Sequence, residues 1–228
     1  MKRRALLSLA LATAFAGAAR AQVPPSPSEV AAYQGLHAAA QRGDLTAIAR
    51  LLKAGAAIDA TDGAGRTPLH VATFARQREA VQALLKAGAN HAALEHGRYD
   101  AVTIAAVADD EETLRILLAG SASARLVTSR YDGTALIAAA HLGHEGVVKQ
   151  LIAAGAPLDH VNNLHWTATI ESIVLGDGGP RHQATLKALI DAGASLQLAD
   201  RSGHTPLALA RSRGYAAMVA MLEKAGAR

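Results

Sequence analysis

Two short stretches decide the fold: Thr67-Pro68-Leu69-His70 and, further along, Leu84-Leu85-Lys86-Ala87-Gly88. The second is an apolar run that ends in a glycine, and such runs recur along the chain. Their glycines are spaced by 33, 32, 35, 38 and 33 residues. A nearly constant spacing over six matches indicates an internal repeat, and this length is typical of helical solenoids. The six glycines are Gly55, Gly88, Gly120, Gly155, Gly193 and Gly226.

A residue that can cap a helix stands twelve residues after most of these glycines. Its side-chain oxygen accepts a hydrogen bond from a free N–H group at the start of a helix. The proline that follows at positions 68 and 206 loses nothing there, because that N–H has no partner within the helix. Each unit therefore opens with a short capped helix, and a small residue on its inner side lets the next unit approach. The capping residues are Thr67, Asp100, Thr134, Thr167 and Thr205, and the small residues are Ala39, Ala72, Ala105, Ala139 and Ala210.

A second helix completes each unit. Its apolar residues recur at helical spacing, as in Val81, Leu84 and Leu85. The closing glycine supplies the left-handed residue that commonly ends a helix. The dozen residues that follow, such as 57–63, are polar and predict an extended link that contains a turn.

These residues resemble the ankyrin repeat, a helix–turn–helix of about 33 residues with a β-hairpin finger. The resemblance covers roughly residues 29–228, and 67–70 and 205–207 match the family motif most closely. It implies an all-α repeat solenoid of about six repeats that follows a linker at 22–28. The third and fifth repeats are degenerate, and only their spacing and apolar pattern place them. The predicted repeats lie at about 29–61, 62–94, 95–127, 128–161, 162–199 and 200–228.

The two end repeats differ from the central ones, as terminal repeats of a solenoid do. The first opens with Ser26-Pro27-Ser28-Glu29, which fits a capping box. Arg50 in the first repeat, and Arg211 and Glu223 in the last, stand where other repeats have apolar or small residues. An array that is capped at both ends favours a monomer.

Two segments break the period. Two extra residues fall within 121–130, and about five fall within 176–181. Surface loops accept insertions at a small entropic cost, so drift explains both segments. The alternative is a loop that recognises a specific partner.

Residues 1–21 have the features of a cleaved secretory signal. Basic residues at 2–4 precede an apolar run at 5–16 that is too short for a lasting membrane span. Ala19 and Ala21 are the small residues that a signal peptidase reads, so we expect cleavage after Ala21 and export to the periplasm. The arginines at 3 and 4 also resemble a twin-arginine signal, although the general secretory route is favoured.

The charge and cysteine counts exclude two classes of function. Four of the 23 basic residues lie in residues 1–21, which leaves 19 basic against 19 acidic residues after cleavage. A neutral chain lacks the electrostatic footprint of a nucleic-acid binder. The chain has no cysteine, so thiol chemistry and disulfides are excluded.

No motif of an enzyme is visible. The glycine-rich stretch 176–179 lacks the preceding strand and the following Lys-Ser/Thr of a phosphate-binding loop. No Gly-x-Ser-x-Gly elbow is present. We therefore predict a protein that is not an enzyme and uses no cofactor.

Ten histidines suggest a metal hypothesis. His141 and His144 are three residues apart, but no carboxylate or cysteine accompanies them in a ligand pattern. The family resemblance implies that His37 and His70 hydrogen-bond to structural backbone. We predict no metal site, while a small-molecule or metal-binding protein that uses finger histidines remains the alternative function. That alternative requires His91, His96, His160 and His165 to converge.

The family resemblance implies that a protein partner docks on the concave face, which the first helices and the finger tips form. Only six aromatic residues follow residue 21, and four of them map to this face. Aromatic and arginine side chains dominate interface energetics, although Phe74 and Trp166 would also fill gaps between repeats. We therefore predict a periplasmic protein-binding scaffold. The predicted protein-binding residues are Arg66, Phe74, Arg98, Tyr99, Val107, Tyr131, His141, Trp166 and His204.

Overall fold

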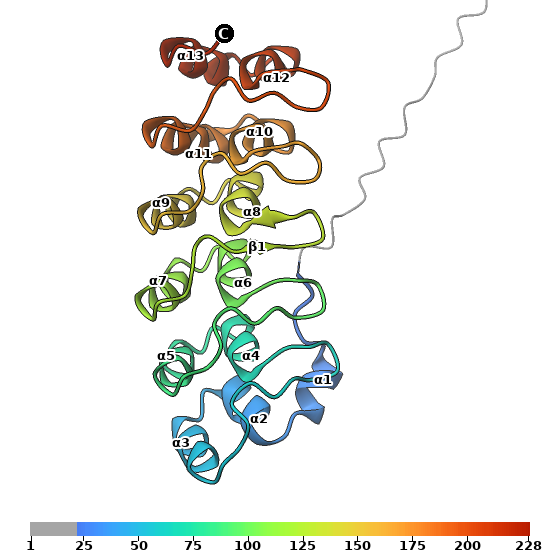
Figure 1. Cartoon of the computed structure of the whole chain (residues 1–228), viewed down its shortest axis with the longest axis vertical. Coiled ribbons are helices and arrows are strands. Elements are labelled where there is room, and N and C mark those ends of the chain that lie inside the picture. The colour runs from blue at the N-terminus through green and yellow to red at the C-terminus, as the bar shows by residue number, and fades with distance from the viewer. Residues whose placement is uncertain (1–21) are drawn as a thin grey trace, which may run out of the picture.

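The computed structural model describes residues 22–228, and the predicted signal at 1–21 lies outside them. In the described part, helix pairs stack into a single column, as predicted for an all-α solenoid (Figure 1). The first helices of the pairs form an inner row and the second helices an outer row. The inner helices are α2 (Gly35–Arg42), α4 (Pro68–Phe74), α6 (Ala101–Val107), α8 (Ala135–Leu142), α10 (Ala168–Val174) and α12 (Pro206–Ser212). The outer helices are α3 (Leu45–Lys53), α5 (Arg78–Lys86), α7 (Glu111–Ala119), α9 (Glu145–Ala153), α11 (Pro180–Asp191) and α13 (Ala216–Lys224).

The predicted capping residues begin the inner helices. The carboxylate of Asp100 accepts the N–H of Thr103 at 2.9 Å, and the hydroxyl of Thr167 accepts the N–H of Ile170 at 3.2 Å. At Thr67 the capping is reciprocal, because the N–H of Thr67 also donates to the ring of His70 at 3.0 Å. His70 bonds through its other ring nitrogen to the carbonyl of Ala93, which confirms the predicted structural role of this histidine.

The outer helices end in left-handed residues, with one correction to the predicted set. Gly120 has an ordinary backbone conformation, and the left-handed residue of that repeat is Ser121, with φ 70°. The N–H of Ser121 bonds to Leu118, as the N–H of Gly55 does to Leu52. The repeat pattern therefore shifts by one residue here, and the segment before Thr134 contains one extra residue instead of two. Local hydrogen bonding decides the shift, because the closing position needs a left-handed conformation rather than glycine itself.

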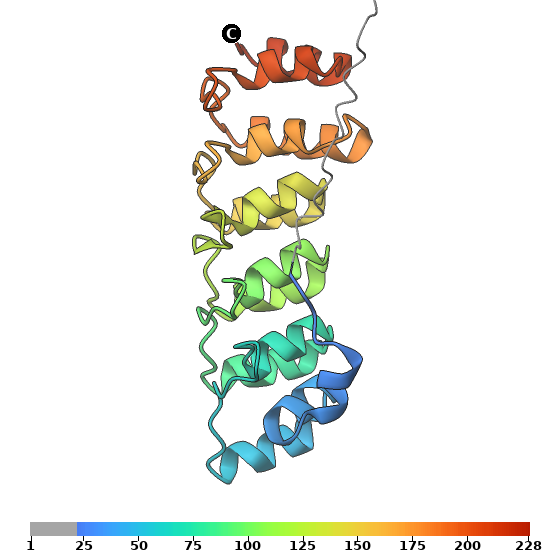
Figure 2. The same ribbon diagram turned by 90° about the vertical axis from the view of Figure 1, so that its right-hand side faces the viewer.

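The capping box at Ser26 begins an additional helix, α1 (Pro27–Ala32), and not the first repeat. The chain becomes extended at Tyr33 and re-enters a helix at Gly35, whose φ is 54°. The Tyr33 hydroxyl donates to Asp62 at 2.7 Å, which ties this break to the next repeat. Figure 2 shows that α1 and the chain before it, in the darkest blue, lie in front of the inner helices. Helix α1 therefore begins within the linker predicted at 22–28 and precedes α2, the inner helix of the first pair.

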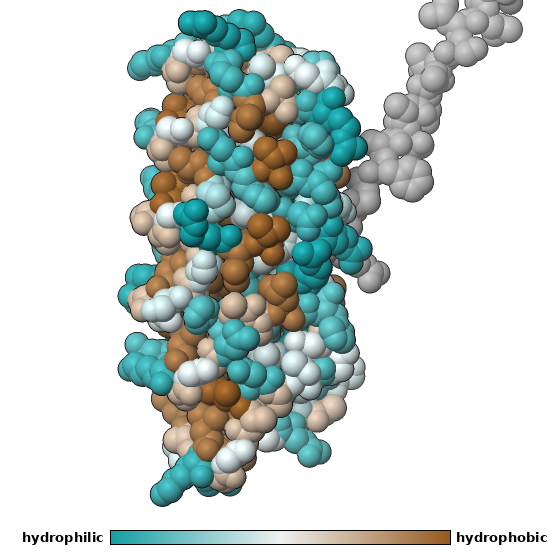
Figure 3. Space-filling model, in the orientation of Figure 1, coloured by the Kyte–Doolittle hydropathy of each residue, from teal (hydrophilic) through white to brown (hydrophobic). Residues whose placement is uncertain are grey.

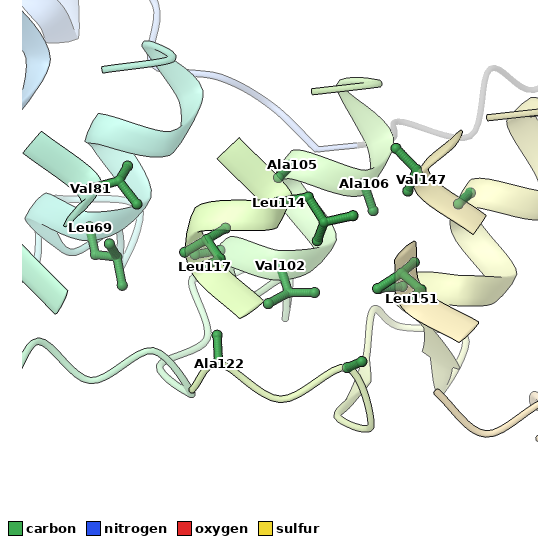
Figure 4. Packing of buried hydrophobic residues seen from close by; sticks show 14 of the residues in the cluster. Leu69, Val81, Val102, Ala105, Ala106, Leu114, Leu117, Ala122, Val147 and Leu151 are labelled. Carbon is green, nitrogen blue, oxygen red and sulfur yellow. The ribbon is translucent and has the colours of Figure 1, made fainter. Parts of the chain in front are cut away.

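The core lies between the rows and between successive pairs. The predicted inner alanines are buried, among them Ala39, Ala105 and Ala139. Figure 4 shows Val102, Leu114 and Leu117 in the space between neighbouring helix pairs. Burial of one such leucine contributes about 2 kcal/mol. The small inner alanines allow close helix contact, while the large residues fill the space toward the outer row.

Charged residues occupy the free outer surfaces of the two end repeats. Arg50 is exposed on α3. At the other end, Arg211 donates to Glu223 at 2.6 Å, and both side chains are exposed. Because these charged side chains stay in contact with solvent, they carry no desolvation penalty, as predicted for terminal repeats.

The two segments that break the period contact the chain itself. The first contains β1 (Val127–Thr128), which pairs antiparallel with β2 (Gly133–Thr134) just after the segment. The second lengthens α11 to 12 residues, against 9 in α9. Arg181 at its start donates to Asp109 at 2.8 Å, which links two helix pairs.

Candidate functional site

A groove of about 910 Å³ runs along the side that is formed by the inner helices and the fingers. The fingers are the loops that lead into the inner helices, such as 156–166. Three aromatic side chains line the groove: Tyr99, Tyr131 and Trp166. Its aliphatic lining comes from Val107, Ile137, Ala138, Leu142, Leu164 and Leu175. The remaining lining residues are Thr103, Thr128, Ser129, Arg130, Gly133, Thr134, His141, Asn162 and Glu171.

The hollow distinguishes this region better than surface hydropathy does. Hydrophobic residues, brown in Figure 3, recur along the whole height of the stack on the face shown. Apolar exposure therefore does not select one repeat. The groove belongs to α6, α8 and α10 and to the fingers that precede them.

In four of the fingers, a side chain braces the turn that leads into the inner helix. The amide oxygen of Asn162 accepts the N–H groups of Leu164 and Trp166, both at 3.0 Å. Asparagine, aspartate and serine favour such turns because their short side chains mimic a backbone acceptor. This turn fixes the backbone from which Trp166 projects. Equivalent turns form at Asp62, Ser129 and Asp200.

Backbone hydrogen bonds also join neighbouring fingers. The N–H of Ser129 donates to the carbonyl of Arg98 at 2.7 Å, and the N–H of Asn163 donates to the carbonyl of Tyr131 at 2.9 Å. The Asn163 amide adds a bond to the carbonyl of Arg130 at 3.0 Å. Three successive fingers are thus held in register, so the groove exists before any partner binds.

The groove contains one buried carboxylate, that of Glu171 on α10, which is 6% exposed. Asn162 donates to its Oε1 at 2.9 Å. The ring nitrogen Nδ1 of His141 on α8 lies 3.7 Å from its Oε2, beyond hydrogen-bond distance. No Lys or Arg of the described residues forms an ion pair with Glu171.

Burial shifts the protonation of both groups. It raises the pKa of Glu171 to about 7, and the hydrogen bond from Asn162 opposes this shift. Burial also lowers the pKa of His141, with a further contribution from the nearby His182. Glu171 is therefore mainly protonated at pH values well below 7, and its negative charge develops as the pH rises through about 7.

Five of the nine predicted binding residues line the groove. They come from three repeats and lie at the ends of inner helices or at finger positions. The five are Tyr99, Val107, Tyr131, His141 and Trp166. The groove lining does not include Phe74, Arg98 or His204. Arg98 pairs with Asp132 at 3.3 Å, and His204 lies 3.4 Å from Asp200.

Arg66 requires a correction. The structure buries this side chain to 2% exposure instead of presenting it to a partner. Its guanidinium pairs with Glu29 of α1 and, at 2.8 Å, with Asp62. A bond of 3.4 Å to the carbonyl of Val23 completes its contacts. The sequence pattern could not show this, because it does not reveal that α1 folds back over the stack.

The sequence pattern did not single out Glu171 or Asn162. Glu171 stands four residues after its capping residue Thr167, where the other repeats carry apolar or small residues. That mismatch was a signal available in the sequence. The equivalents of Glu171 are Val71, Ile104, Ala138 and Leu209.

No group of three or more potential ligands for a metal ion occurs within residues 22–228. His160, one of the four finger histidines named above, bonds to the carbonyl of Asp132 at 2.6 Å. The finger histidines therefore do not converge as the metal alternative requires. Across the same residues, every helix is too short or too polar to cross a membrane.

Comparison with known proteins identifies the family. A family model described as ankyrin repeats in three copies matches residues 21–94, 36–129 and 102–196, which together span most of the chain. The chain belongs to the ankyrin repeat family. Ankyrin repeats generally act as protein-interaction scaffolds, and ankyrin repeat proteins are generally not enzymes.

Relatives of known sequence or structure agree with this assignment. The putative ankyrin repeat protein YahD of Escherichia coli (strain K12) is 37% identical over 190 residues, which cover 83% of this chain and 94% of that protein. An ankyrin repeat domain from Acinetobacter baumannii AYE is 42% identical, with a TM-score of 0.79, and covers 85% of this chain and 98% of that chain. The ankyrin repeat domain of Bcl-3, a member of the IkappaB family, is 28% identical, with a TM-score of 0.77. That match covers 86% of this chain and 88% of the Bcl-3 chain.

Proposed function

We propose that this ankyrin repeat protein is a periplasmic scaffold that binds another protein in the groove of α6, α8 and α10. The observation that carries the proposal is the gathering of scarce aromatic residues. Tyr99, Tyr131 and Trp166 come from three separate repeats and line one hollow. Aromatic side chains in such hollows are typical anchors of protein interfaces.

The rigid fingers support binding energetically. Association loses free energy when loops and side chains must become ordered. Here the bonds from Ser129 to Arg98 and from Asn163 to Tyr131 already order the fingers. A few buried aromatic contacts can therefore be sufficient for useful affinity.

The position of α1 argues against docking at the first repeats. The guanidinium of Arg66 already pairs with Glu29 and donates to the carbonyl of Val23. The segment that carries these two residues lies in front of the first inner helices (Figure 2). The open part of the same side begins at the finger that carries Tyr99. The proposed site is therefore confined to the repeats that contain α6, α8 and α10.

The binding test is a pull-down from a periplasmic extract of the host, with tagged protein that begins at Gln22. The variant Tyr99→Ala/Trp166→Ala removes two groove aromatics, and Leu94→Ala/Val161→Ala removes two exposed apolar residues outside the groove. We expect a partner that the wild type and the control retain and the groove variant loses. Equal retention by all three, with unchanged helical content by circular dichroism, would contradict the proposed site.

The periplasmic location rests on the basic and apolar features of residues 1–21. Its test is cell fractionation of a C-terminally tagged chain, with mass spectrometry of the mature protein. We expect a periplasmic product that begins at Gln22, and a full-length product in the cytoplasm would contradict export. Light scattering of the same product tests the expected monomer.

A further inference from the structure

The hydrogen bond from Asn162 uses only one of the two carboxylate oxygens of Glu171, so it does not by itself explain why a carboxylate stands in the groove. The equivalent residues Val71 and Ile104 are fully buried, so an apolar residue fits this position in the fold. An ionised carboxylate at such a site carries a desolvation cost unless it gains a partner. A carboxylate at such a site is explained if a ligand supplies the partner and so offsets the desolvation cost.

Glu171 lines the groove, and one of its two carboxylate oxygens has no hydrogen-bond partner among the described residues. Oε1 already accepts a hydrogen bond from Asn162. Oε2 accepts none from the described residues, and its nearest charged or ionisable neighbour is His141, at 3.7 Å. A donor that enters the groove can therefore reach an acceptor that the chain itself leaves unpaired.

We propose that the partner places a lysine or arginine side chain in the groove, with its charged head on Oε2 of Glu171. The inference rests on the proposed function and specifies the chemistry of the partner. The apolar lining suits the aliphatic stem of a basic side chain, which commonly packs along apolar surface while its head stays polar. Trp166 and Leu175 belong to that lining near α10.

Charge complementarity selects a basic side chain over an acidic or apolar one. An acidic side chain would bring a second negative charge to a buried carboxylate, and an apolar one would leave Oε2 unsatisfied. Arg130, also in the lining, is exposed and forms no ion pair within the described residues. It disfavours a second basic residue near its own finger, so the basic side chain is confined to the Glu171 part of the groove.

The interaction should strengthen as the pH rises through about 7, because Glu171 ionises in that range. The helices that pack against α10 also carry titratable and charged groups. His141 lies on α8, and His182 on α11 donates to the carbonyl of His141 at 2.9 Å. Arg181 on α11 and Arg211 on α12 are each paired, with Asp109 and Glu223 respectively. At low pH, protonation of either histidine adds a positive charge that would repel a basic side chain. Loss of the Glu171 charge and gain of a histidine charge therefore both weaken binding as the pH falls.

The test is selection from a phage-displayed library of random linear peptides at pH 8. The baits are the wild type, Glu171→Gln and the control Glu145→Gln. In Glu171→Gln the new amide oxygen can still accept the hydrogen bond from Asn162, so we expect the fold to be maintained. Glu145 lies on α9 outside the groove, with a side chain that is 41% exposed and pairs with Lys149. We expect one lysine or arginine to be enriched with the wild type and the control, and not with Glu171→Gln.

The affinity of the best synthetic peptide then measures the pair. We expect Glu171→Gln to weaken binding by roughly 10- to 100-fold at pH 8, as for a charged hydrogen bond. Replacing the basic residue of the peptide by glutamine should weaken binding similarly. When this peptide is tested against Glu171→Gln, the affinity should fall little further, because the same interaction is already lost. The affinity for the wild type should fall from pH 8 to pH 6, and the affinity for Glu171→Gln should change much less.

Two outcomes would overturn the inference, and they differ in what they say about the proposed function. Peptides that need Tyr99 and Trp166 but carry no enriched basic residue, and that bind Glu171→Gln equally, would refute only the basic anchor. Peptides whose binding survives Tyr99→Ala/Trp166→Ala, or a failure to select any peptide, would count against the groove itself and so against both proposals.

Discussion

At the scale of single residues, the repeat tolerates substitutions that its motif would not predict. Ser121 takes a left-handed conformation that glycine takes in other repeats, and Glu171 replaces an apolar residue of an inner helix. Each exception has a physical cost. The cost at Ser121 is backbone strain, and the cost at Glu171 is desolvation of a charge.

Replacement of Glu171 by glutamine should stabilise the protein at alkaline pH. The folded pKa of about 7 exceeds the ordinary value of 4.5, so the folded state holds its proton over a range in which the unfolded state has lost it. The wild type therefore loses stability as the pH rises from 4.5 through 7, by about 3 kcal/mol in all. Urea unfolding at pH 5 and pH 8 should show that the advantage of Glu171→Gln grows with pH. An advantage that is equal at both pH values would contradict the buried-charge explanation.

Ser121→Gly should stabilise the protein by about 0.5–1 kcal/mol, because glycine adopts a positive φ without steric strain. The neighbouring change Ala119→Gly should have the opposite sign, since Ala119 is the last residue of α7 and has a helical backbone. The midpoints of urea unfolding measure both effects. Destabilisation by Ser121→Gly would indicate that the serine side chain contributes more than its strained backbone costs.

At the scale of elements, α1 covers the first repeats and leaves the groove open. Its contacts are Glu29 with Arg66, and Tyr33 with Asp62 just after the helix. Both partners lie in the finger before α4, which is outside the groove. The covering element and the candidate site thus occupy different repeats.

Deletion of residues 22–32 should therefore affect α2 and α4 but not the groove. Each unit of a solenoid depends mainly on its neighbours, so amide hydrogen exchange should accelerate in α2 and α4 and remain unchanged in α10 and α12. Peptides that are selected on the groove should bind the shortened chain with unchanged affinity. A change in that affinity would show that α1 and the groove are coupled.

At the scale of the whole molecule, the stack is a one-dimensional object in which contacts join a repeat mainly to its neighbours. Its main hydrophobic cluster extends from Leu36 to Ala194, and a second cluster from Ile173 to Leu222 completes the C-terminal end. The bond from Arg181 to Asp109 is among the longest links in sequence within the described part. The effect of a destabilising core substitution on unfolding should therefore depend on its position along the stack.

Leu117→Ala and Leu222→Ala test this expectation, because both leucines are fully buried. Each should lower stability by about 2–5 kcal/mol. The central change should also broaden the urea transition, since it weakens the link between the two halves of the stack. The terminal change should mainly fray α12 and α13 in hydrogen exchange. Identical, equally sharp transitions for the two variants would contradict local coupling.

The sequence by itself determined the paired helices of the repeats, their order and the stacked fold. These features depend on capping residues such as Thr67 and Thr205, on apolar spacing, and on small residues such as Ala105, all of which act within one repeat or between neighbours. The aromatic residues of the groove were also predicted, because they stand at fixed positions of the repeat.

Only the tertiary structure decided which of these positions are open. The burial of Arg66 depends on α1 folding back across the stack, which no periodic pattern contains. The groove depends on Tyr99, Tyr131 and Trp166, from three repeats, lining one hollow. The protonation of its buried carboxylate depends on the side chains that surround it in the folded chain. Repetition fixes what is local, whereas exposure and charge environment depend on contacts between residues far apart in the chain.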